Sequence, residues 1–344
     1  MEPGTFRALR QQLRLTQQDL AEKLNGRFAR SYDKPKVSKW ETGRDSVPDD
    51  VARALEAMVA AQPRNAQVVA LANQKGGVGK TTSALNISAA LAASGHRVLL
   101  VDADPQATAT TALFGAGGVD FYREERTLAH VLLRGRDVPQ VIVSAGSTAA
   151  GRTAPFDIIA SHIDLSEVDG RREPGFEVAL AEALDTVRPS YDFILIDAPP
   201  NLGVLTVMAL AAAELVLIPV QTEPFDSMGV GLILQTIRKV QRRLNTRLRL
   251  AGILPTRYTA ARAVDREVLL HLMAAMEGAA PVLEPVPDSA VFGKAAMAGR
   301  LALDASPSAR PVQVYSRLAA ALAGGGQLPR ASADLSQTAV EPVA

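Results

Sequence analysis

A glycine-rich stretch with two lysines carries the clearest chemistry in this sequence. It reads Gln74-Lys75-Gly76-Gly77-Val78-Gly79-Lys80-Thr81-Thr82, after an apolar run at 68–72 and before an Ala-rich stretch at 83–93. The glycines let successive backbone N–H groups face one anion, and the start of the following helix adds free donors and partial positive charge. In such a loop Lys80 reaches the β- and γ-phosphates, and the Thr81 hydroxyl binds Mg²⁺. The stretch therefore predicts a phosphate-binding loop between a strand and a helix.

The spacing of this loop departs from the ordinary pattern, in which a first glycine would stand at position 74. Lys75 instead opens the glycine run, which makes this the deviant Walker motif with a second lysine. The sequence here resembles the ParA/MinD-type P-loop ATPases. The alternative, an incidental turn with two solvated lysines, leaves the matching flanks unexplained. The resemblance implies that ATP is bound between two subunits, with Lys75 reaching the partner's phosphates. The predicted nucleotide-binding residues of the loop are Lys75, Gly76, Gly77, Val78, Gly79, Lys80, Thr81 and Thr82.

Two apolar stretches end in acids, at Asp102-Ala103-Asp104 and at Asp197. Ligands of open α/β sheets bind at the carboxyl ends of strands, so these acids are expected beside the loop. A single strand-end aspartate could equally cap a helix, but two of them after a phosphate-binding loop match the ParA pattern. The resemblance assigns Asp197, with Thr81, to Mg²⁺ and Asp104 to the attacking water, while Asp102 orders the loop. Lys75, Lys80 and Asp104 are then the catalytic residues.

Adenine contacts are carried over by resemblance alone. The family places them after its later strands, where this chain has Thr256, Arg257, Pro287 and Asp288. Pro255 departs from the usual pattern, so these four positions rest on a weaker match than the loop does.

Continuous apolar runs in the sequence predict the strands that would position these residues, because such runs are typical of buried parallel strands. They alternate with Ala-rich helical stretches, so we expect a doubly wound, mostly parallel α/β sheet after a small all-α domain. The expected boundaries are a helix-turn-helix domain at 1–62, a linker at 63–67, an ATPase domain at 68–323 and a disordered tail at 324–344. Residues 115–155 read as a surface excursion with one helix, 128–133. The expected strands are 97–101, 156–160, 193–196, 215–220 and 248–254.

The composition of the 344 residues excludes several classes of protein. There is no cysteine, so disulfides, thiolate zinc sites and cysteine-held iron–sulfur clusters are impossible. The N-terminus is polar and charged, unlike a signal peptide, and no apolar stretch is long enough to span a bilayer. The net charge of +1 does not by itself point to nucleic acid. We expect a cytoplasmic protein with no membrane partner.

The first 62 residues resemble the Cro/phage-repressor-type helix-turn-helix family. The match rests on residues 15–24, where Thr16 is the expected N-cap, and on residues 37–43. Residues 25–36 are longer than the family's usual turn. Six basic and two acidic residues between 27 and 44 favour DNA, although a helical protein-binding adaptor with a solvated basic face would look similar. The predicted DNA contacts in this domain are Lys34, Lys36, Ser38 and Lys39.

A second basic segment, 227–264, contains no acidic residue. Its like charges at i, i+4 on a helix repel one another, a cost that a polyanion relieves. Charge runs are usually solvated faces, so the ParA resemblance is what favours DNA. The predicted DNA-binding residues here are Arg238, Lys239, Arg242 and Arg243.

Together the two resemblances imply a DNA-partition ATPase that uses ATP and Mg²⁺. It would form a homodimer on ATP, coat nucleoid DNA non-specifically and hydrolyse ATP when a ParB-like protein stimulates it; its N-terminal domain would recognise an operator and repress transcription. A nucleotide-switched transcriptional regulator would use the same residues and stays an alternative. A MinD-like membrane ATPase is disfavoured, because 327–344 lacks the amphipathic stripe that class needs.

Overall fold

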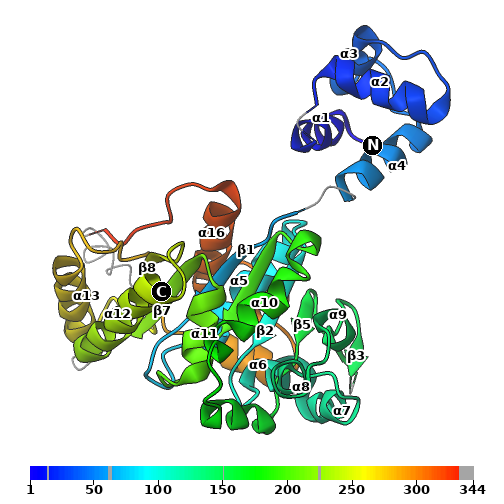
Figure 1. Ribbon diagram of the computed structural model, residues 1–344. Coiled ribbons are helices and arrows are strands. Elements are labelled where there is room, and N and C mark those ends of the chain that lie inside the picture. Colours follow the sequence, from blue (N-terminus) through cyan, green and yellow to red (C-terminus); the bar gives the residue numbers. More distant parts are fainter. Residues whose placement is uncertain (14, 61–63, 150, 224–225, 333–344) are drawn as a thin grey trace. The chain divides into compact units, whose positions relative to one another are not determined.

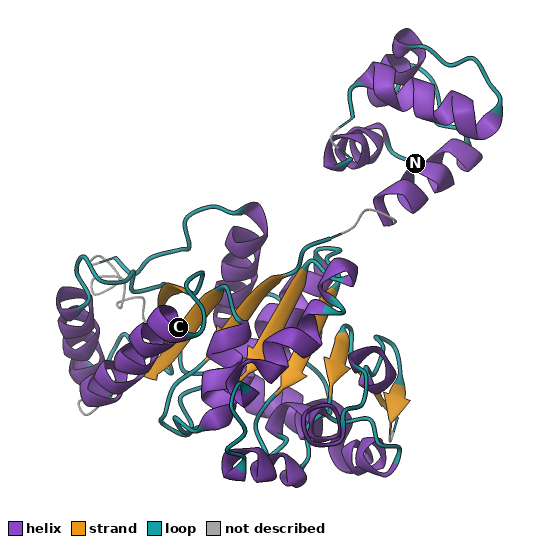
Figure 2. Cartoon of the chain, in the orientation of Figure 1, coloured by secondary structure: helices purple, strands orange, loops and turns teal. Residues whose placement is uncertain are grey.

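The structure is a computed structural model, and it describes residues 1–13, 15–60, 64–149, 151–223 and 226–332 (Figure 1). The chain divides into two compact units, Met1–Arg64 and Asn65–Ala344. Figure 2 shows that the first unit is helical and that the second contains a sheet with helices around it. No helix in the described part of the chain is both long and apolar enough to cross a membrane.

The N-terminal unit contains four helices within the described residues: α1 (Pro3–Gln12), α2 (Gln17–Phe28), α3 (Lys34–Glu41) and α4 (Asp49–Ala60). Their apolar faces close on a core around Phe6 and Trp40, whose rings pack edge to face with centroids 5.6 Å apart. The start of α2 follows the expected capping pattern. The Thr16 hydroxyl accepts from the Asp19 N–H at 3.1 Å, and the Asp19 carboxylate accepts from the Thr16 N–H at 2.9 Å.

The unusually long connection between the two helix-turn-helix segments is mostly helix. α2 continues to Phe28 and stops at Ala29, which adopts a left-handed conformation with φ of 50°. Asp33 then caps α3 by accepting from the Lys36 N–H at 2.8 Å. The Asn25 side chain holds the intervening loop through both backbone groups of Tyr32, at 2.6 and 2.8 Å. The additional residues therefore lengthen α2 and leave a short loop before α3.

In the second unit, six parallel strands among the described residues form one sheet in the order β5-β2-β6-β1-β7-β8. Side chains alternate between its faces, so Val68 and Ala70 join one core while Val69 and Leu71 join the other. This confirms the expected parallel α/β sheet. The strands are β1 (Gln67–Leu71), β2 (Val98–Asp102), β5 (Asp157–Ile159), β6 (Phe193–Asp197), β7 (Leu215–Gln221) and β8 (Arg249–Thr256).

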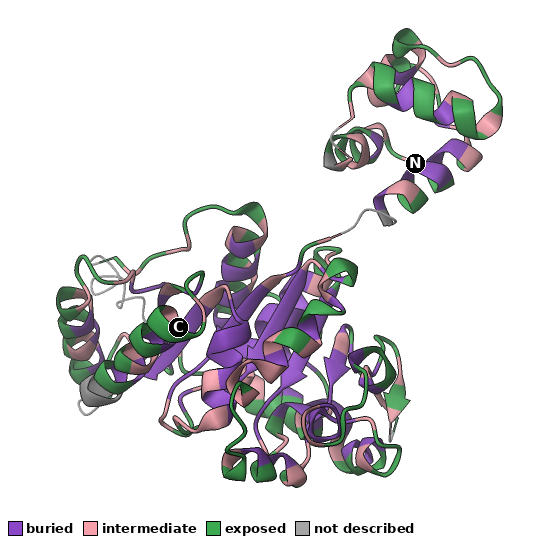
Figure 3. Ribbon diagram, viewed as in Figure 1, coloured by how far each residue is buried: buried purple, intermediate pink, exposed green. Residues whose placement is uncertain are grey.

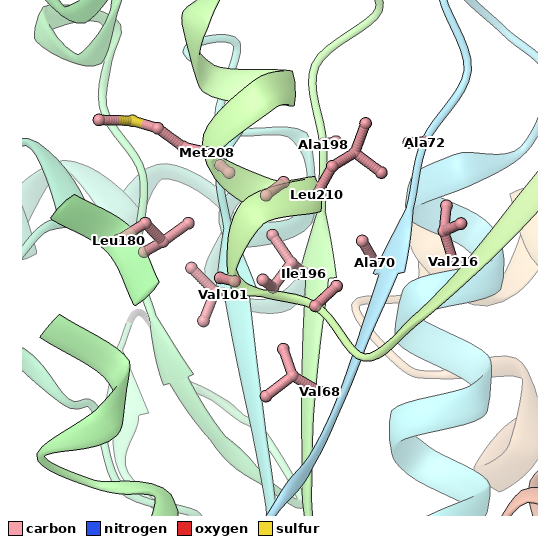
Figure 4. Packing of buried hydrophobic residues seen from close by; sticks show 14 of the residues in the cluster. Val68, Ala70, Ala72, Val101, Leu180, Ile196, Ala198, Met208, Leu210 and Val216 are labelled. Atoms are coloured by element: carbon pink, nitrogen blue, oxygen red, sulfur yellow. The ribbon is translucent and has the colours of Figure 1, made fainter. Parts of the chain in front are cut away.

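Helices cover both faces of this sheet, and its strands are the most buried part of the unit (Figure 3). Figure 4 shows the core of the first face, where Met208 and Leu210 of α11 lie beside Ile196 and Ala198. Helices α8 (Leu128–Arg134), α10 (Ala179–Asp185), α11 (Val204–Ala212), α12 (Asp226–Arg243) and α13 (Ala263–Ala275) contribute to that face. Helices α5 (Lys80–Ala93), α6 (Thr108–Phe114) and α16 (Arg310–Gly324) cover the other. The other α-helices and strands of this unit among the described residues are α7 (Gly118–Arg123), α9 (Val138–Val141), α14 (Val291–Met297), α15 (Ala302–Ala305) and the hairpin of β3 (Thr148–Ala149) with β4 (Arg152–Thr153).

Two expectations differ from the structure. The excursion 115–155 contains α7 and α9 besides the expected helix, because Phe121 and Val138 each bury an apolar side chain in a core. The expected disorder from 324 onward is wrong for Gly324, which ends α16 (Arg310–Gly324), and for residues 329–331. The backbone of residues 329–331 pairs with residues 282–284, as in the Ala331 N–H donating to the Val282 carbonyl at 3.0 Å. Residues 333–344 of the expected tail, and residues 61–63 at the expected domain boundary, lie outside the described residues.

Candidate nucleotide-binding site

The glycine-rich loop joins β1 to α5, as its flanks predicted. Gly77 and Gly79 have φ of 76° and 86°, a conformation that side chains with a Cβ rarely adopt. Neighbouring strands hold the loop from outside. The Gln221 side chain donates to the Gly77 carbonyl at 2.9 Å, and the Thr256 hydroxyl donates to the Val78 carbonyl at 2.9 Å. Both bonds hold the loop through its carbonyl oxygens, so they do not occupy the backbone N–H groups that a phosphate-binding loop turns toward an anion.

Lys80 begins α5 and is 7% exposed. Its ammonium donates to the Lys75 carbonyl at 3.0 Å, so the side chain folds back over the loop. Burial lowers the pKa of Lys80, and the carboxylates of Asp197 and Asp104 counter that shift. The loop and the two strand-end acids are thus brought together around one buried cation.

Asp197 ends β6 and is fully buried, and neither of its carboxylate oxygens has a hydrogen-bond partner among the described residues. Burial raises the pKa of Asp197 and Asp102 adds to the rise. The Thr81 hydroxyl, close enough to favour the charged form although it is outside hydrogen-bonding geometry, and Lys80 counter it. An unsatisfied buried carboxylate is costly unless a cation or a donor meets it. No cluster of three or more His, Cys, Asp or Glu within the described residues could hold a metal alone. The donor set of Thr81 and Asp197 therefore fits Mg²⁺ that takes its other ligands from phosphates and water.

Replacing Asp197 by asparagine should stabilise the nucleotide-free protein. The pKa of this carboxyl is raised on folding, so its protonated form is favoured in the folded state, and ionisation costs stability as pH rises above the unfolded pKa. A neutral side chain of the same size removes that cost at pH 7. We expect Asp197→Asn to raise the melting temperature of this unit by on the order of 2–4 °C in Mg²⁺-free buffer, measured by scanning calorimetry.

Asp102→Asn is the matched control, because it removes a second fully buried carboxylate one strand away. Asp102 accepts from the Thr110 N–H at 2.8 Å and from the Thr110 hydroxyl at 2.7 Å, so an amide there forfeits hydrogen bonds. Burial also raises the pKa of Asp102, to about 6, but less than it raises that of Asp197, so Asp102→Asn should raise the melting temperature less than Asp197→Asn does. A fall in melting temperature for Asp197→Asn would contradict the cost assigned to the unpaired carboxylate.

Asp104 lies in the loop after β2 and is 8% exposed. Its carboxylate accepts from the Gln106 N–H at 2.9 Å, and its own N–H donates to Asp102 at 3.3 Å. Asp102 therefore orders this loop, the structural part expected for it. The Asp104 carboxylate also interacts electrostatically with Lys80, which suits a residue that orients water beside the phosphates.

Lys75 pairs with Glu223, just after β7, at 2.8 Å. Both side chains are partly exposed, and ion pairs of this kind contribute little to stability. The lysine can therefore exchange this carboxylate for phosphates at low cost.

Of the residues predicted to contact adenine, only some lie close together. Arg257 and Asp288 approach each other at 3.7 Å, and Tyr258 pairs with Pro287, so the two expected loops lie side by side. Arg257 has φ of 54°, an unusual conformation for a residue with a side chain. Thr256 is buried and its hydroxyl is already bonded to the loop backbone. The structure thus makes Thr256 a support of the phosphate-binding loop.

The predicted DNA contacts are distributed over both units, each on its own helix. On α3, Lys34 and Lys39 are exposed, Ser38 is half-buried, and Lys36 pairs with Asp45 at 3.0 Å. On α12, all four basic side chains are exposed. Lys239 and Arg243 line a cavity of about 630 Å³ between α12 and α11. Lys239 also lines a second, of about 470 Å³, together with Arg238 and Arg242.

Sequence reasoning missed two residues that support the site and gave a third, Thr256, a different role. Gln221 and Thr256 hold the loop. Asn73 accepts from the Lys75 N–H at 3.2 Å and donates to the Pro219 carbonyl at 2.7 Å. Only their positions in the sequence could have indicated this role, because each is a polar residue at or just beyond the end of an apolar strand.

Comparison with known proteins agrees with this geometry. A family model described as an AAA domain matches residues 66–250, and one described as a helix-turn-helix domain matches residues 4–66. The chromosome-partitioning ATPase Soj of Thermus thermophilus is 39% identical over 251 residues, which cover 73% of this chain and 93% of that protein. The chain belongs to the Soj/ParA family. Both resemblances inferred from the sequence are thereby confirmed.

Other proteins similar to this Soj/ParA chain carry different names. An uncharacterized protein of Mycobacterium tuberculosis is 42% identical over 211 residues, 60% of this chain, and the match spans 63% of that protein's length. The crystal structure of cobyrinic acid a,c-diamide synthase from Mycobacterium smegmatis, with bound ATP analogue and magnesium, is 33% identical. It covers 78% of this chain and all of that one, with a TM-score of 0.65. The fold of the second unit is therefore shared with a nucleotide-bound relative.

Proposed function

We propose that this protein is a DNA-partition ATPase that uses ATP and Mg²⁺. The observation that carries the proposal is the buried arrangement of Lys80 with Asp197, whose carboxylate has no partner among the described residues, at the mouth of a deviant phosphate-binding loop. A structural ion pair would be satisfied by hydrogen bonds, whereas this site is arranged for a phosphate and a cation. The family name of the Thermus relative supports partition as the cellular task.

The chain's own residues supply much of the positioning that phosphoryl transfer requires. Backbone N–H groups of residues 76–81 and the Lys80 ammonium bind the β- and γ-phosphates. Thr81 and Asp197 would hold Mg²⁺, which would supply positive charge beside the phosphate oxygens. Asp104 orients the attacking water from the loop after β2. These roles place ATP at the carboxyl ends of β1, β2 and β6.

The position of Lys75 supports a proposed dimer. Its side chain lies at the surface, held by Glu223 in its own subunit. ATP in a facing subunit offers phosphates that compete for this ammonium, so ATP binding favours a homodimer. A ParB-like partner would then stimulate hydrolysis, and the cycle would run on the nucleoid in the cytoplasm.

DNA binding is divided between the two units in this proposal. The exposed basic rows of α12 suit the phosphate backbone of any duplex, which needs charge and no base reading. Helix α3 presents Lys34 and Lys39 on a helix-turn-helix, whose second helix reads base edges in the major groove. If α3 reads an operator, the protein also represses transcription, and the regulator alternative becomes a second activity of the same chain.

Substitutions on the two helices should separate these activities. Replacing Arg238, Lys239, Arg242 and Arg243 by alanine should remove ATP-dependent binding to random DNA. In a plot of the logarithm of the DNA-binding constant against the logarithm of salt concentration, the slope should become shallower. The expected change is roughly 0.9 for each DNA phosphate that the protein no longer neutralises. Lys34→Ala/Lys39→Ala should instead remove preference for promoter-region DNA. The measurement is fluorescence anisotropy of full-length protein on both duplexes, with ATP and with ADP, at several salt concentrations.

Arg7→Ala/Arg53→Ala is the charge-matched control, since it removes two exposed cations from α1 and α4 of the same unit. It should leave sequence preference intact. If Lys34→Ala/Lys39→Ala keeps the preference as well, the N-terminal unit is a protein-binding adaptor. If the variant with the four alanine substitutions on α12 still shows ATP-dependent binding to random DNA, the basic side chains of α12 are exposed to solvent and do not bind DNA.

A further inference from the structure

Ser161 follows β5, the strand at one edge of the sheet, and is 2% exposed. Its hydroxyl donates to the backbone carbonyl of Asp104 at 2.7 Å. Its N–H donates to the Thr110 hydroxyl at 2.9 Å. A residue far along the chain thus contacts the loop that carries the water-orienting acid.

Thr110 links Ser161 to Asp102 through hydrogen bonds. It is 1% exposed, and its hydroxyl and N–H both donate to the Asp102 carboxylate, at 2.7 and 2.8 Å. Asp102 in turn accepts from the Asp104 N–H at 3.3 Å. The four residues form a closed ring of buried hydrogen bonds with Asp104 in it. Satisfied buried networks of this kind fix one conformation.

The loop needs such support because its own geometry is unfavourable. The Asp104 carbonyl accepts a second bond from the Ala107 N–H at 2.8 Å, and Ala107 has φ of 51°. Alanine has no local interaction that favours this left-handed conformation, so the surrounding structure must impose it. The Asp104 carboxylate is attached to this same turn through the Gln106 N–H.

We propose that Ser161 is a positioning residue for ATP hydrolysis. By holding the Asp104 carbonyl, it fixes the direction of the Asp104 carboxylate toward the attacking water, and β5 is the element that delivers it. The inference rests on the proposed role of Asp104. It gives the edge strand and the long excursion before it a part in the reaction, since small misplacements of a catalytic group cost large factors in rate.

The test is Ser161→Ala in the full-length protein, with single-turnover hydrolysis at saturating ATP and ATP affinity measured separately. We expect the hydrolysis rate to fall about tenfold while the Kd for ATP stays within about twofold, because Ser161 touches only the Asp104 side of the site. Ser161→Thr keeps a hydroxyl and should recover much of the rate. Thr110→Val, nearly isosteric, breaks the same ring elsewhere and should also slow hydrolysis.

Ser83→Ala is the matched control. Ser83 is equally buried, and its hydroxyl bonds the Tyr315 hydroxyl at 2.8 Å, away from Asp104. It should lose comparable thermal stability but keep the hydrolysis rate. If Ser161→Ala hydrolyses as fast as Ser83→Ala, or if its ATP affinity falls with its rate, the positioning role is overturned. Wild-type hydrolysis by Asp104→Ala would instead overturn the proposed function of the site itself.

Discussion

Replacing Lys80 by alanine is expected to abolish ATP binding. The ammonium is buried at the head of α5 and bonded to the loop backbone, so its position is set before the nucleotide arrives. Removing one member of a buried charge pair costs about 3–5 kcal/mol, which corresponds to a loss of affinity of about two orders of magnitude or more. Titration calorimetry with ATP and Mg²⁺ measures this directly.

Lys75→Ala is the control for that experiment. It removes the other lysine of the same loop, but this side chain is partly exposed and paired with Glu223. A single subunit should therefore still bind ATP, while the ATP-dependent dimer should no longer form in analytical ultracentrifugation. ATP affinity that is unchanged in Lys80→Ala would refute the assignment of the phosphate-binding loop.

Asp104→Ala is expected to retain ATP and to block its hydrolysis. The phosphates are bound by the loop and by Lys80, so affinity should change little. The water loses the group that orients it, and removal of a positioned acid or base typically costs a factor of about 10²–10⁴. Because hydrolysis ends the ATP-bound state, the variant should accumulate as an ATP-bound dimer. Phosphate release and sedimentation, recorded on the same sample, report both effects.

Asp104→Asn separates charge from packing in this prediction. The amide keeps the size of the side chain and an oxygen for the Gln106 N–H, but it lacks the negative charge. It should be as defective in hydrolysis as Asp104→Ala, with a melting temperature closer to that of the wild type. Turnover at the wild-type level in either variant would remove Asp104 from the reaction.

The phosphate-binding loop, the buried strands and the start of α2 could be predicted from the sequence alone. A phosphate-binding loop is a local feature: Gly77, Gly79, Lys80 and the adjoining helix lie within a few residues, so their types and spacing suffice. Buried strands were equally visible, because a parallel strand covered on both faces is apolar at every position. Thr16 and Asp19 identified a helix start for the same reason, since a capping box is confined to the first turn of a helix.

The tertiary structure decided how each functional group is supported. Asp102 and Asp197 are alike in sequence, each ending an apolar strand. Only their neighbours distinguish them, because Thr110 satisfies Asp102 while Asp197 has no hydrogen-bond partner among the described residues. Ser161 contacts Asp104 only because β5 lies beside β2 in the sheet. Such contacts join residues far apart in the chain, so they follow from strand order and packing, and no local pattern of residues encodes them.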